Sequence, residues 1–105
     1  MINLKYIGHA GWFVETGDMR ALFDPWFNPY GTFMNSWHQF PQNSHLLTDD
    51  LIRDLDFVYI SHSHSDHYDE WTLQKIKRST LILIPNFRDK TLKKKLKKLS
   101  FTNIR

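Results

Sequence analysis

The chain has 105 residues, which limits it to one small domain. Its 14 basic and 11 acidic residues give a net charge of +3, so it is only mildly basic. It contains no cysteine, which excludes disulfides, thiolate zinc sites and iron–sulfur clusters held by cysteine. The chain opens without a cationic leader and apolar core, and no apolar run approaches the roughly 20 residues that a bilayer requires. We therefore expect a soluble, cytoplasmic protein.

The first part of the chain predicts a β-meander. Residues 3–7 and 12–16 are short runs rich in β-branched and aromatic residues, and residues 19–24 form a third such run. The segments "GHAG" and "TGD" between them are turn sequences. Three consecutive strands with such short connections indicate antiparallel pairing.

Residues 25–44, here called the aromatic loop, show no helical or strand period. Six aromatic residues lie in this loop: Trp26, Phe27, Tyr30, Phe33, Trp37 and Phe40. A loop of this length in a compact domain is usually functional or disordered, and its aromatic content argues against disorder. Two interpretations stay open: a wall of a substrate pocket that suits an acyl chain or sugar ring, or packing over the sheet edge and against a partner. We expect His38 and His45 to take part in hydrogen bonds of this loop and not to bind metal.

The second part of the chain alternates between helix and strand patterns. Thr48 is a suitable N-cap for a helix over 48–55, and the apolar run 57–60 predicts a strand covered on both faces. Further patterns predict, in order, a helix over 69–79, a strand over 81–84, a helix over 88–99, and the start of a strand in 101–105. This order indicates an α/β fold with parallel strands and crossover helices.

A basic run, "KTLKKKLKK", occupies residues 90–98. Such a run suits nucleic acid or anionic lipid, but it also suits the solvated face of a helix whose apolar face is Leu92, Leu96 and Leu99. Because a single short segment carries the charge, we favour the solvated face and expect no nucleic-acid partner.

The segment "SHSHSDH", residues 61–67, holds three of the six histidines of the chain. Its candidate metal ligands are His62, His64, Asp66 and His67, here called the histidine cluster. Imidazole nitrogen and carboxylate oxygen suit zinc, iron and manganese. Residues two apart in an extended segment point the same way, so His62 and His64 can bind one ion, while Asp66 and His67 can reach an adjacent position. The cluster follows a buried strand, where α/β sheets place their sites.

The run His-x-His-x-Asp-His, preceded by a meander that carries "GHAGWFVE" and "ALFDPWF", resembles the N-terminal half of the metallo-β-lactamase-fold hydrolases. The resemblance covers essentially the whole chain. The "GHA" turn and the "FDPW" segment look most similar to one branch, which holds ascorbate-6-phosphate lactonases, N-acylphosphatidylethanolamine phospholipases D and the lactamase-like part of CMP-sialate hydroxylases. The implied fold is half of an αββα sandwich.

By this resemblance, His62 and His64 would hold one metal ion and Asp66 with His67 a second. The expected ion is Zn²⁺, with iron or manganese as alternatives. Asp66 would also be catalytic, because its counterparts orient a metal-activated hydroxide that attacks an ester, lactone, amide or phosphodiester of a small-molecule substrate. Asp24 would support the ligands from behind, although it also suits a turn before a proline.

Two further residues are pocket candidates. His9 could reach the metal cavity from the first turn, or it could be a structural histidine of that turn. Trp26 could contribute to the wall of the pocket as part of the aromatic loop.

The resemblance also implies an incomplete site. The family's remaining ligands come from its C-terminal half, and none of residues 101–105 is of a ligand type. Half a sandwich would expose an apolar sheet face. We therefore expect a truncated domain that associates with itself or with a partner chain covering this face. The alternative function is a non-catalytic interaction module.

Overall fold

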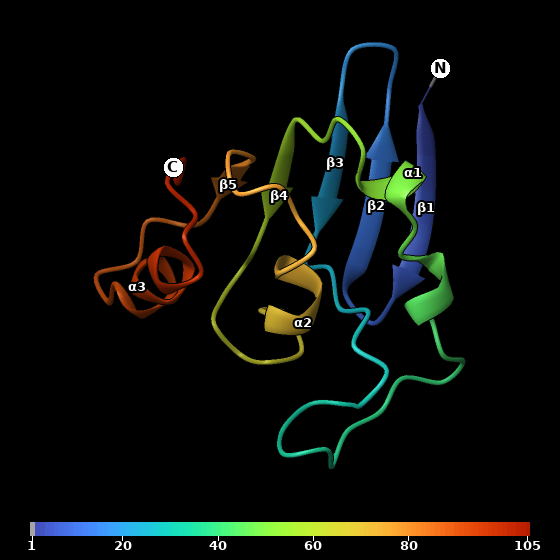
Figure 1. Ribbon diagram of the computed structural model, residues 1–105, viewed down its shortest axis with the longest axis horizontal. Coiled ribbons are helices and arrows are strands. Elements are labelled where there is room, and N and C mark those ends of the chain that lie inside the picture. Colours follow the sequence, from blue (N-terminus) through green and yellow to red (C-terminus); the bar gives the residue numbers. More distant parts are fainter. Residues whose placement is uncertain (1) are drawn as a thin grey trace.

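The computed structural model describes residues 2–105 and has a mixed five-stranded sheet (Figure 1). The strands are β1 (Asn3–Gly8), β2 (Gly11–Glu15), β3 (Arg20–Phe23), β4 (Phe57–Tyr59) and β5 (Leu81–Leu83). The helices are the 3₁₀-helix η1 (Ser44–Leu46), α1 (Asp49–Ile52), α2 (Glu70–Leu73) and α3 (Thr91–Lys98). The strand order in the sheet is β1-β2-β3-β4-β5.

The sheet has an antiparallel and a parallel part. β1, β2 and β3 pair antiparallel, which confirms the predicted meander. β4 pairs parallel with β3, and β5 pairs parallel with β4. Ile104 makes a parallel bridge to Ile82, so the last residues lie beside β5 as predicted. The chain therefore has the α/β order expected for half of a metallo-β-lactamase sandwich.

One edge of the sheet collects the segments that matter for the site. Because β1, β3 and β4 all run in the same direction, their C-terminal ends lie at the same edge. Figure 1 shows the aromatic loop and the connection from β4 to α2 leaving the sheet there. His9, Asp24 and Ser61 follow these three ends closely, which brings residues distant in sequence together.

All three predicted helices are shorter in the structure, and α3 covers only Thr91–Lys98 of the predicted 88–99. Thr48 caps α1 as expected, since its side chain accepts a hydrogen bond from the Leu51 amide, but the helix stops at Ile52. Asp54 then adopts a positive φ of 52°, which turns the chain toward β4. α2 ends at Leu73, where the Arg78 guanidinium donates to the carbonyls of Leu73, Gln74 and Ile76 and satisfies the groups that a longer helix would use.

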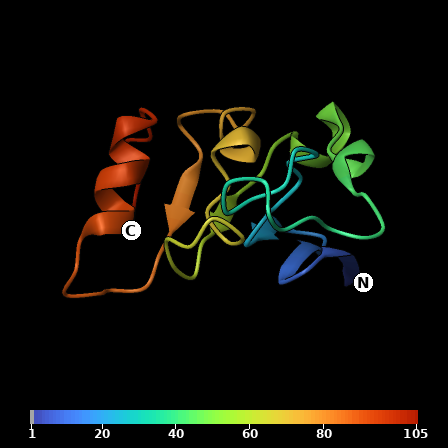
Figure 2. The ribbon, with the colours of Figure 1, turned by 90° about the horizontal axis from the view of Figure 1, so that it is seen from below.

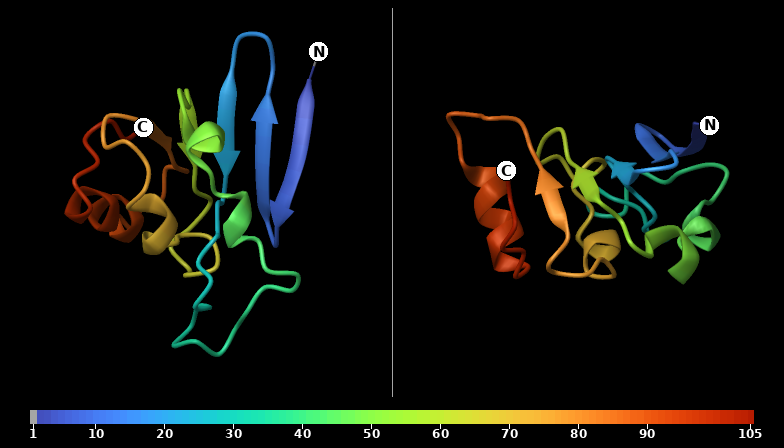
Figure 3. Two further views of the ribbon diagram at one scale, coloured as in Figure 1. Left: turned by 45° about the vertical axis from the view of Figure 1, so that its right-hand side comes forward. Right: turned by 90° about the horizontal axis from the view of Figure 1, so that it is seen from above.

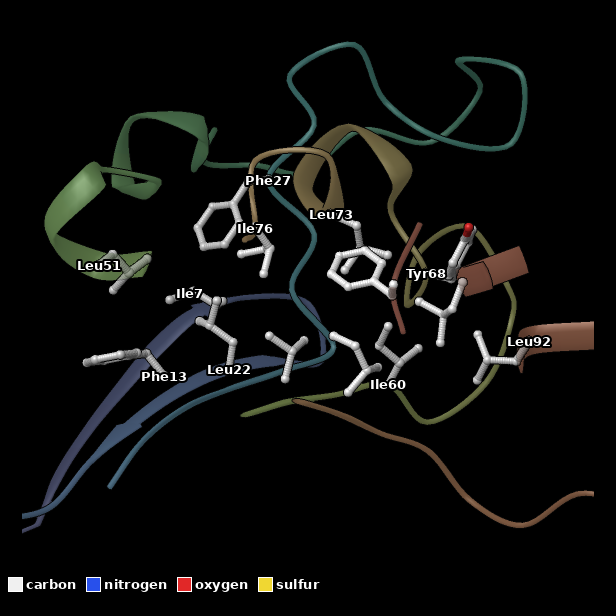
Figure 4. Close-up of a cluster of buried hydrophobic side chains, with 14 residues drawn as sticks. Ile7, Phe13, Leu22, Phe27, Leu51, Ile60, Tyr68, Leu73, Ile76 and Leu92 are labelled. Carbon is white, nitrogen blue, oxygen red and sulfur yellow. The ribbon is translucent and has the colours of Figure 1, made fainter. Parts of the chain in front are cut away.

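One face of the sheet carries the core. Figures 2 and 3 show α1 and α2 on the same side of the sheet, and α3 lies at its β5 end. Side chains from the sheet and from these helices fill the space between them (Figure 4). Phe27, from the start of the aromatic loop, is fully buried in this cluster. On α3, Leu92 and Leu96 are buried while most of the lysines are exposed, as the solvated-face interpretation predicts.

The opposite face, here called the open face, is uncovered. Two cross-strand rows point to it: Leu4, Val14, Ala21, Phe57 and Leu81, and Tyr6, Trp12, Phe23, Tyr59 and Leu83. Leu4 is 64% exposed, Tyr6 55% and Trp12 42%. The prediction that the strand after residue 56 is covered on both faces was wrong, because Phe57 and Tyr59 are only partly buried. These two side chains are only partly buried because no layer covers this apolar face of the sheet.

A buried carboxylate ties the aromatic loop to α2. Asp69 accepts hydrogen bonds from the amides of Phe27 and Asn28, and from the Thr72 hydroxyl. Burial raises the pKa of Asp69 above its usual value, although these hydrogen bonds act in the opposite direction.

This raised pKa predicts how stability depends on pH. The folded state binds the Asp69 proton more tightly than the unfolded state does, so the contribution of Asp69 falls as pH rises through and above about 4. Asp69→Asn, which keeps an acceptor oxygen without the charge, should remove this dependence. Urea denaturation between pH 4 and 7 measures it, with the exposed Asp18→Asn as control. Parallel pH profiles for Asp69→Asn and the wild type would contradict the prediction.

Within residues 2–105, no helix combines the length and the apolar character needed to cross a membrane.

Candidate metal centre

The histidine cluster lies on the connection that follows β4. The amides of His67 and Tyr68 donate to the His64 carbonyl at 2.9 and 2.7 Å, which closes a tight turn. The turn brings the imidazoles together: the ring centres of His62 and His64 are 4.7 Å apart, and those of His62 and His67 are 4.0 Å apart. The spacing seen in the sequence therefore gives a real convergence of side chains.

Asp66 joins two groups of potential ligands. One group is His62, His64 and Asp66, and the other is His9, Asp66 and His67. Within each group the ligand atoms lie within 4.8 Å of one another. The four side chains of the histidine cluster thus lie close to one another and to His9, in two groups that share Asp66.

Asp24 lies behind the histidines and is buried. Its Oδ1 accepts from the Ser61 amide at 2.7 Å, and its Oδ2 accepts from the Ser61 hydroxyl at 2.8 Å. The Nδ1 of His67 lies 3.0 Å from the same Oδ2. An aspartate holds this place with a positive φ of 43°, a conformation that aspartate tolerates better than most residues. The carboxylate accepts from His67 Nδ1–H, so the Nε2 lone pair of His67 is free for a metal ion.

Ser61 extends this support to a second imidazole. Its hydroxyl lies 2.9 Å from His62 Nδ1 while it also contacts Asp24. When the hydroxyl donates to Asp24, its oxygen can accept from His62 Nδ1–H, which leaves the Nε2 of His62 free as well. Sequence reasoning missed this residue, because only the histidines and the aspartate of the motif were considered as functional. Its position directly after the strand was the available signal.

His9 contacts the cluster from the first turn. Its Nε2 lies 2.7 Å from Asp66 Oδ2, and its ring lies 5.4 Å from that of His67. Gly8 makes this possible: it has a φ of 122°, and a Cβ there would meet the side chains of Gln39 and Asn43. Of the two interpretations open for His9, the structure places it at the cavity.

Trp26 is buried beside His9, with the two rings edge to face at 5.3 Å. Its carbonyl accepts from Gln39 and Asn43, which fastens the aromatic loop to the site. His38 bonds to the Asn35 carbonyl within the loop, and neither His38 nor His45 belongs to a group of potential ligands among residues 2–105.

The donor set suits a divalent cation. Asp66 Oδ1 is buried and has no hydrogen-bond partner among residues 2–105, which is costly for a carboxylate oxygen unless a positive group lies against it. The four neighbouring imidazoles supply nitrogen ligands of the type that zinc and iron prefer. Burial, with His67 and His64 nearby, lowers the pKa of His62, so this imidazole is neutral and able to bind metal at pH 7.

Two hollows border the cluster. The larger one, of about 930 Å³, lies beside His9 and Trp26 and is lined by the aromatic loop. The smaller one, of about 310 Å³, lies beside His62 and Ser63 and includes Arg88 and Asp89. A substrate could therefore approach the cluster from surfaces of different character.

Residues 3–105 match the family described as the Beta-lactamase superfamily domain. The chain belongs to this family. Among solved structures, the superfamily member from Veillonella parvula described as a possible metal-dependent hydrolase has a TM-score of 0.79, with 25% identity over 100% of this chain and 42% of its own. CmlA, a diiron β-hydroxylase from Streptomyces venezuelae, has the same fold, with a TM-score of 0.68 and 24% identity.

Curated superfamily relatives are much longer. A protein of Mycolicibacterium smegmatis that carries a Rieske 2Fe-2S iron–sulfur name is 39% identical over 97% of this chain, which is 19% of its own length. The cytidine monophosphate-N-acetylneuraminic acid hydroxylase of Danio rerio is 38% identical over 73% of this chain and 13% of its own. The latter belongs to one of the groups that the sequence resembled. The superfamily is a metal-binding one, in agreement with the assembled donors.

The link through Ser61 leads to a prediction. Ser61→Ala removes the acceptor for His62 Nδ1–H, so His62 loses its fixed orientation and Zn²⁺ affinity should fall by about 10-fold. Isothermal titration with Zn²⁺ measures the change. Ser61→Thr, which keeps the hydroxyl, should restore the affinity, and Ser63→Ala is the matched control within the motif. Equal affinities for Ser61→Ala and Ser63→Ala would contradict the role of the hydroxyl.

Proposed function

We propose that this chain is part of a metal-dependent hydrolase that binds one or two divalent cations, with Zn²⁺ as the expected ion. The ligands in this proposal are His62, His64, Asp66 and His67. The observation that carries it is the gathering of the histidines around Asp66, whose buried Oδ1 has no hydrogen-bond partner among residues 2–105.

In this proposal the residues of the site have distinct roles. When bound, the ions lower the pKa of a water molecule toward neutrality and polarise the bond under attack. Asp66 is the catalytic residue, because its carboxylate can accept a hydrogen bond from the attacking water and fix its direction. Asp24 keeps the proton of His67 on Nδ1 and so keeps Nε2 available. The substrate class is an ester, lactone, amide or phosphodiester, as the resemblance implies.

The donors of this chain alone are few for catalysis. His62 and His64 supply two imidazole ligands to the first ion, whereas catalytic zinc sites commonly use three protein ligands. The chain spans about two fifths of the Veillonella structure and less of the curated relatives. We propose that further ligands come from a part of the fold outside these residues.

The identity of the ion is open to direct measurement. The name of CmlA reports two irons, and an oxygen and nitrogen donor set suits iron and manganese as well as zinc. The Rieske name of the mycobacterial relatives does not transfer to these residues, since a Rieske cluster needs two cysteines and this sequence has none.

Metal analysis of the purified protein is the test. After loading with Zn²⁺, Fe²⁺ or Mn²⁺ in separate samples and desalting, we expect at least one ion per chain, and His62→Ala with His64→Ala should abolish retention. His38→Ala and His45→Ala are matched controls, because both histidines lie outside the cluster. Substoichiometric metal that is the same in all variants would refute the proposed function.

A non-catalytic interaction module is the second candidate. The open face favours it, because Leu4, Tyr6 and Trp12 expose large apolar side chains in adjacent strands. We propose that a second copy or a partner chain covers this face. Sedimentation analysis of the purified chain tests the self-association, and a stable, well-folded monomer under all conditions would contradict it.

A further inference from the structure

The hollow beside His9 continues from the metal centre into the aromatic loop. His9 and Trp26 line it, and the same His9 bonds to Asp66 of the histidine cluster. Its volume of about 930 Å³ is of the size that takes a small-molecule ligand. A group held in this hollow would therefore lie next to the atoms that bind the metal.

The wall of this hollow is free of formal charge apart from its histidines. Among its 15 lining residues none is an aspartate, glutamate, lysine or arginine. At the charged fraction of the whole chain, 24%, a wall of this size would carry about four such residues. Aromatic, aliphatic and amide side chains take their place. The side chains of this wall would thus offer no formal counter-charge to an anionic or cationic ligand.

Charged residues do line a separate hollow that also borders the cluster. The smaller hollow next to His62 includes Arg88 and Asp89. The two approaches to the metal centre therefore differ in chemistry. The His9 side favours an uncharged group, and the His62 side can accept a charged one.

Two aromatic side chains of the hollow, Trp37 and Phe40, lie outside the core. Phe40 is 99% exposed and Trp37 is 53% exposed, whereas Trp26 and Phe27 of the same loop are buried. Gln39 and Asn43 use their amide nitrogens to bind the Trp26 carbonyl, and Asn43 also binds the Ile7 carbonyl, so they hold the loop against β1. The loop is thus held against β1 while the rings of Trp37 and Phe40 remain exposed to a ligand.

We propose that this hollow binds an uncharged aromatic or acyl part of the substrate and directs the adjoining scissile bond toward Asp66. The inference rests on the proposed function and adds the substrate class: a neutral, apolar recognition group on the His9 side.

Two fluorescent probes of equal ring structure test the inference. N-phenyl-1-naphthylamine is neutral, and 1-anilinonaphthalene-8-sulfonate is the same molecule with one sulfonate. Both probes are titrated into the full chain, with and without Zn²⁺. The neutral probe should bind at least 10-fold more tightly than the sulfonate probe. Phe40→Ala should lower the affinity for the neutral probe by about 10-fold. Gln42→Lys places a cation on the wall, so it should raise the affinity for the sulfonate probe at least 5-fold.

Two matched variants locate the binding. Phe87→Ala removes an exposed aromatic ring from the other hollow region, and Trp12→Ala removes one from the open face. Each should change the affinity for the neutral probe by less than 2-fold. Equal affinity for both probes, or binding that Trp12→Ala removes and Phe40→Ala leaves intact, would overturn the inference.

The same experiment separates this inference from the proposed function. His62→Ala should leave the affinity for the neutral probe within 2-fold of that of the wild type, with or without metal. Intact probe binding in a protein that retains no metal would refute only the proposed function. Full metal binding, together with a neutral-probe affinity that Phe40→Ala leaves unchanged, would refute only the proposed ligand binding in the hollow.

Discussion

Replacing Asp24 by asparagine should lower the affinity for Zn²⁺ by about 10- to 100-fold while the fold persists. The carboxylate accepts three hydrogen bonds, from the Ser61 amide, the Ser61 hydroxyl and His67 Nδ1–H. An asparagine has one acceptor oxygen, so its NH₂ group must face either the Ser61 amide or His67. If it faces His67, the proton of the imidazole moves to Nε2, and the nitrogen that should bind metal is blocked.

Zn²⁺ titration and nitrogen NMR of the His67 tautomer together measure this effect. Asp18→Asn, in an exposed turn, is the control and should change neither. Asp24→Ala removes every acceptor, so it should also destabilise the fold by about 2–4 kcal/mol, because buried donors lose their partner. An unchanged affinity together with an unchanged tautomer in Asp24→Asn would exclude the supporting role of Asp24.

Phe27→Ala should destabilise the protein by about 3–5 kcal/mol. The Phe27 ring is fully buried, and it packs where the aromatic loop meets the helices over the sheet. Its removal leaves a cavity, because the surrounding side chains come from separate elements and cannot all move inward. For a small domain this loss is a large share of the total stability, so the histidine cluster should also lose its geometry.

Urea denaturation followed by circular dichroism measures the loss. Phe40→Ala is a matched control: it is the same substitution in the same loop, but Phe40 is 99% exposed, so the change should stay within about 0.5 kcal/mol. Similar midpoints for the two variants would show that Phe27 is not part of the core in solution.

Much of the fold could be predicted from local patterns. The turn sequences between the first three strands and the apolar runs before and after α2 identified all five strands, within a residue or two of the observed ends. The helix ends were less predictable. α2 stops at Leu73 because Arg78 binds its last carbonyls, and this contact depends on how the chain folds back after the helix.

Some residues of the site could likewise be predicted from the sequence, and others could not. The motif itself identified His62, His64, Asp66 and His67, because imidazoles two residues apart after a strand converge for local reasons. For His9 the sequence left two interpretations open and did not predict its contact with Asp66, since 57 residues separate the two. Ser61 was missed for a related reason: its task appears only when Asp24 is brought beside it.

The sequence by itself determined the order of strands and helices, the ligand types of the motif and the absence of cysteine chemistry. These properties are set by residues close together in the chain. Tertiary structure alone decided which distant residues meet the motif, because the parallel β1, β3 and β4 bring His9, Asp24 and Ser61 to one edge. It also decided that one hollow near the cluster has an uncharged wall and another includes Arg88 and Asp89, since each wall combines residues that are distant in sequence.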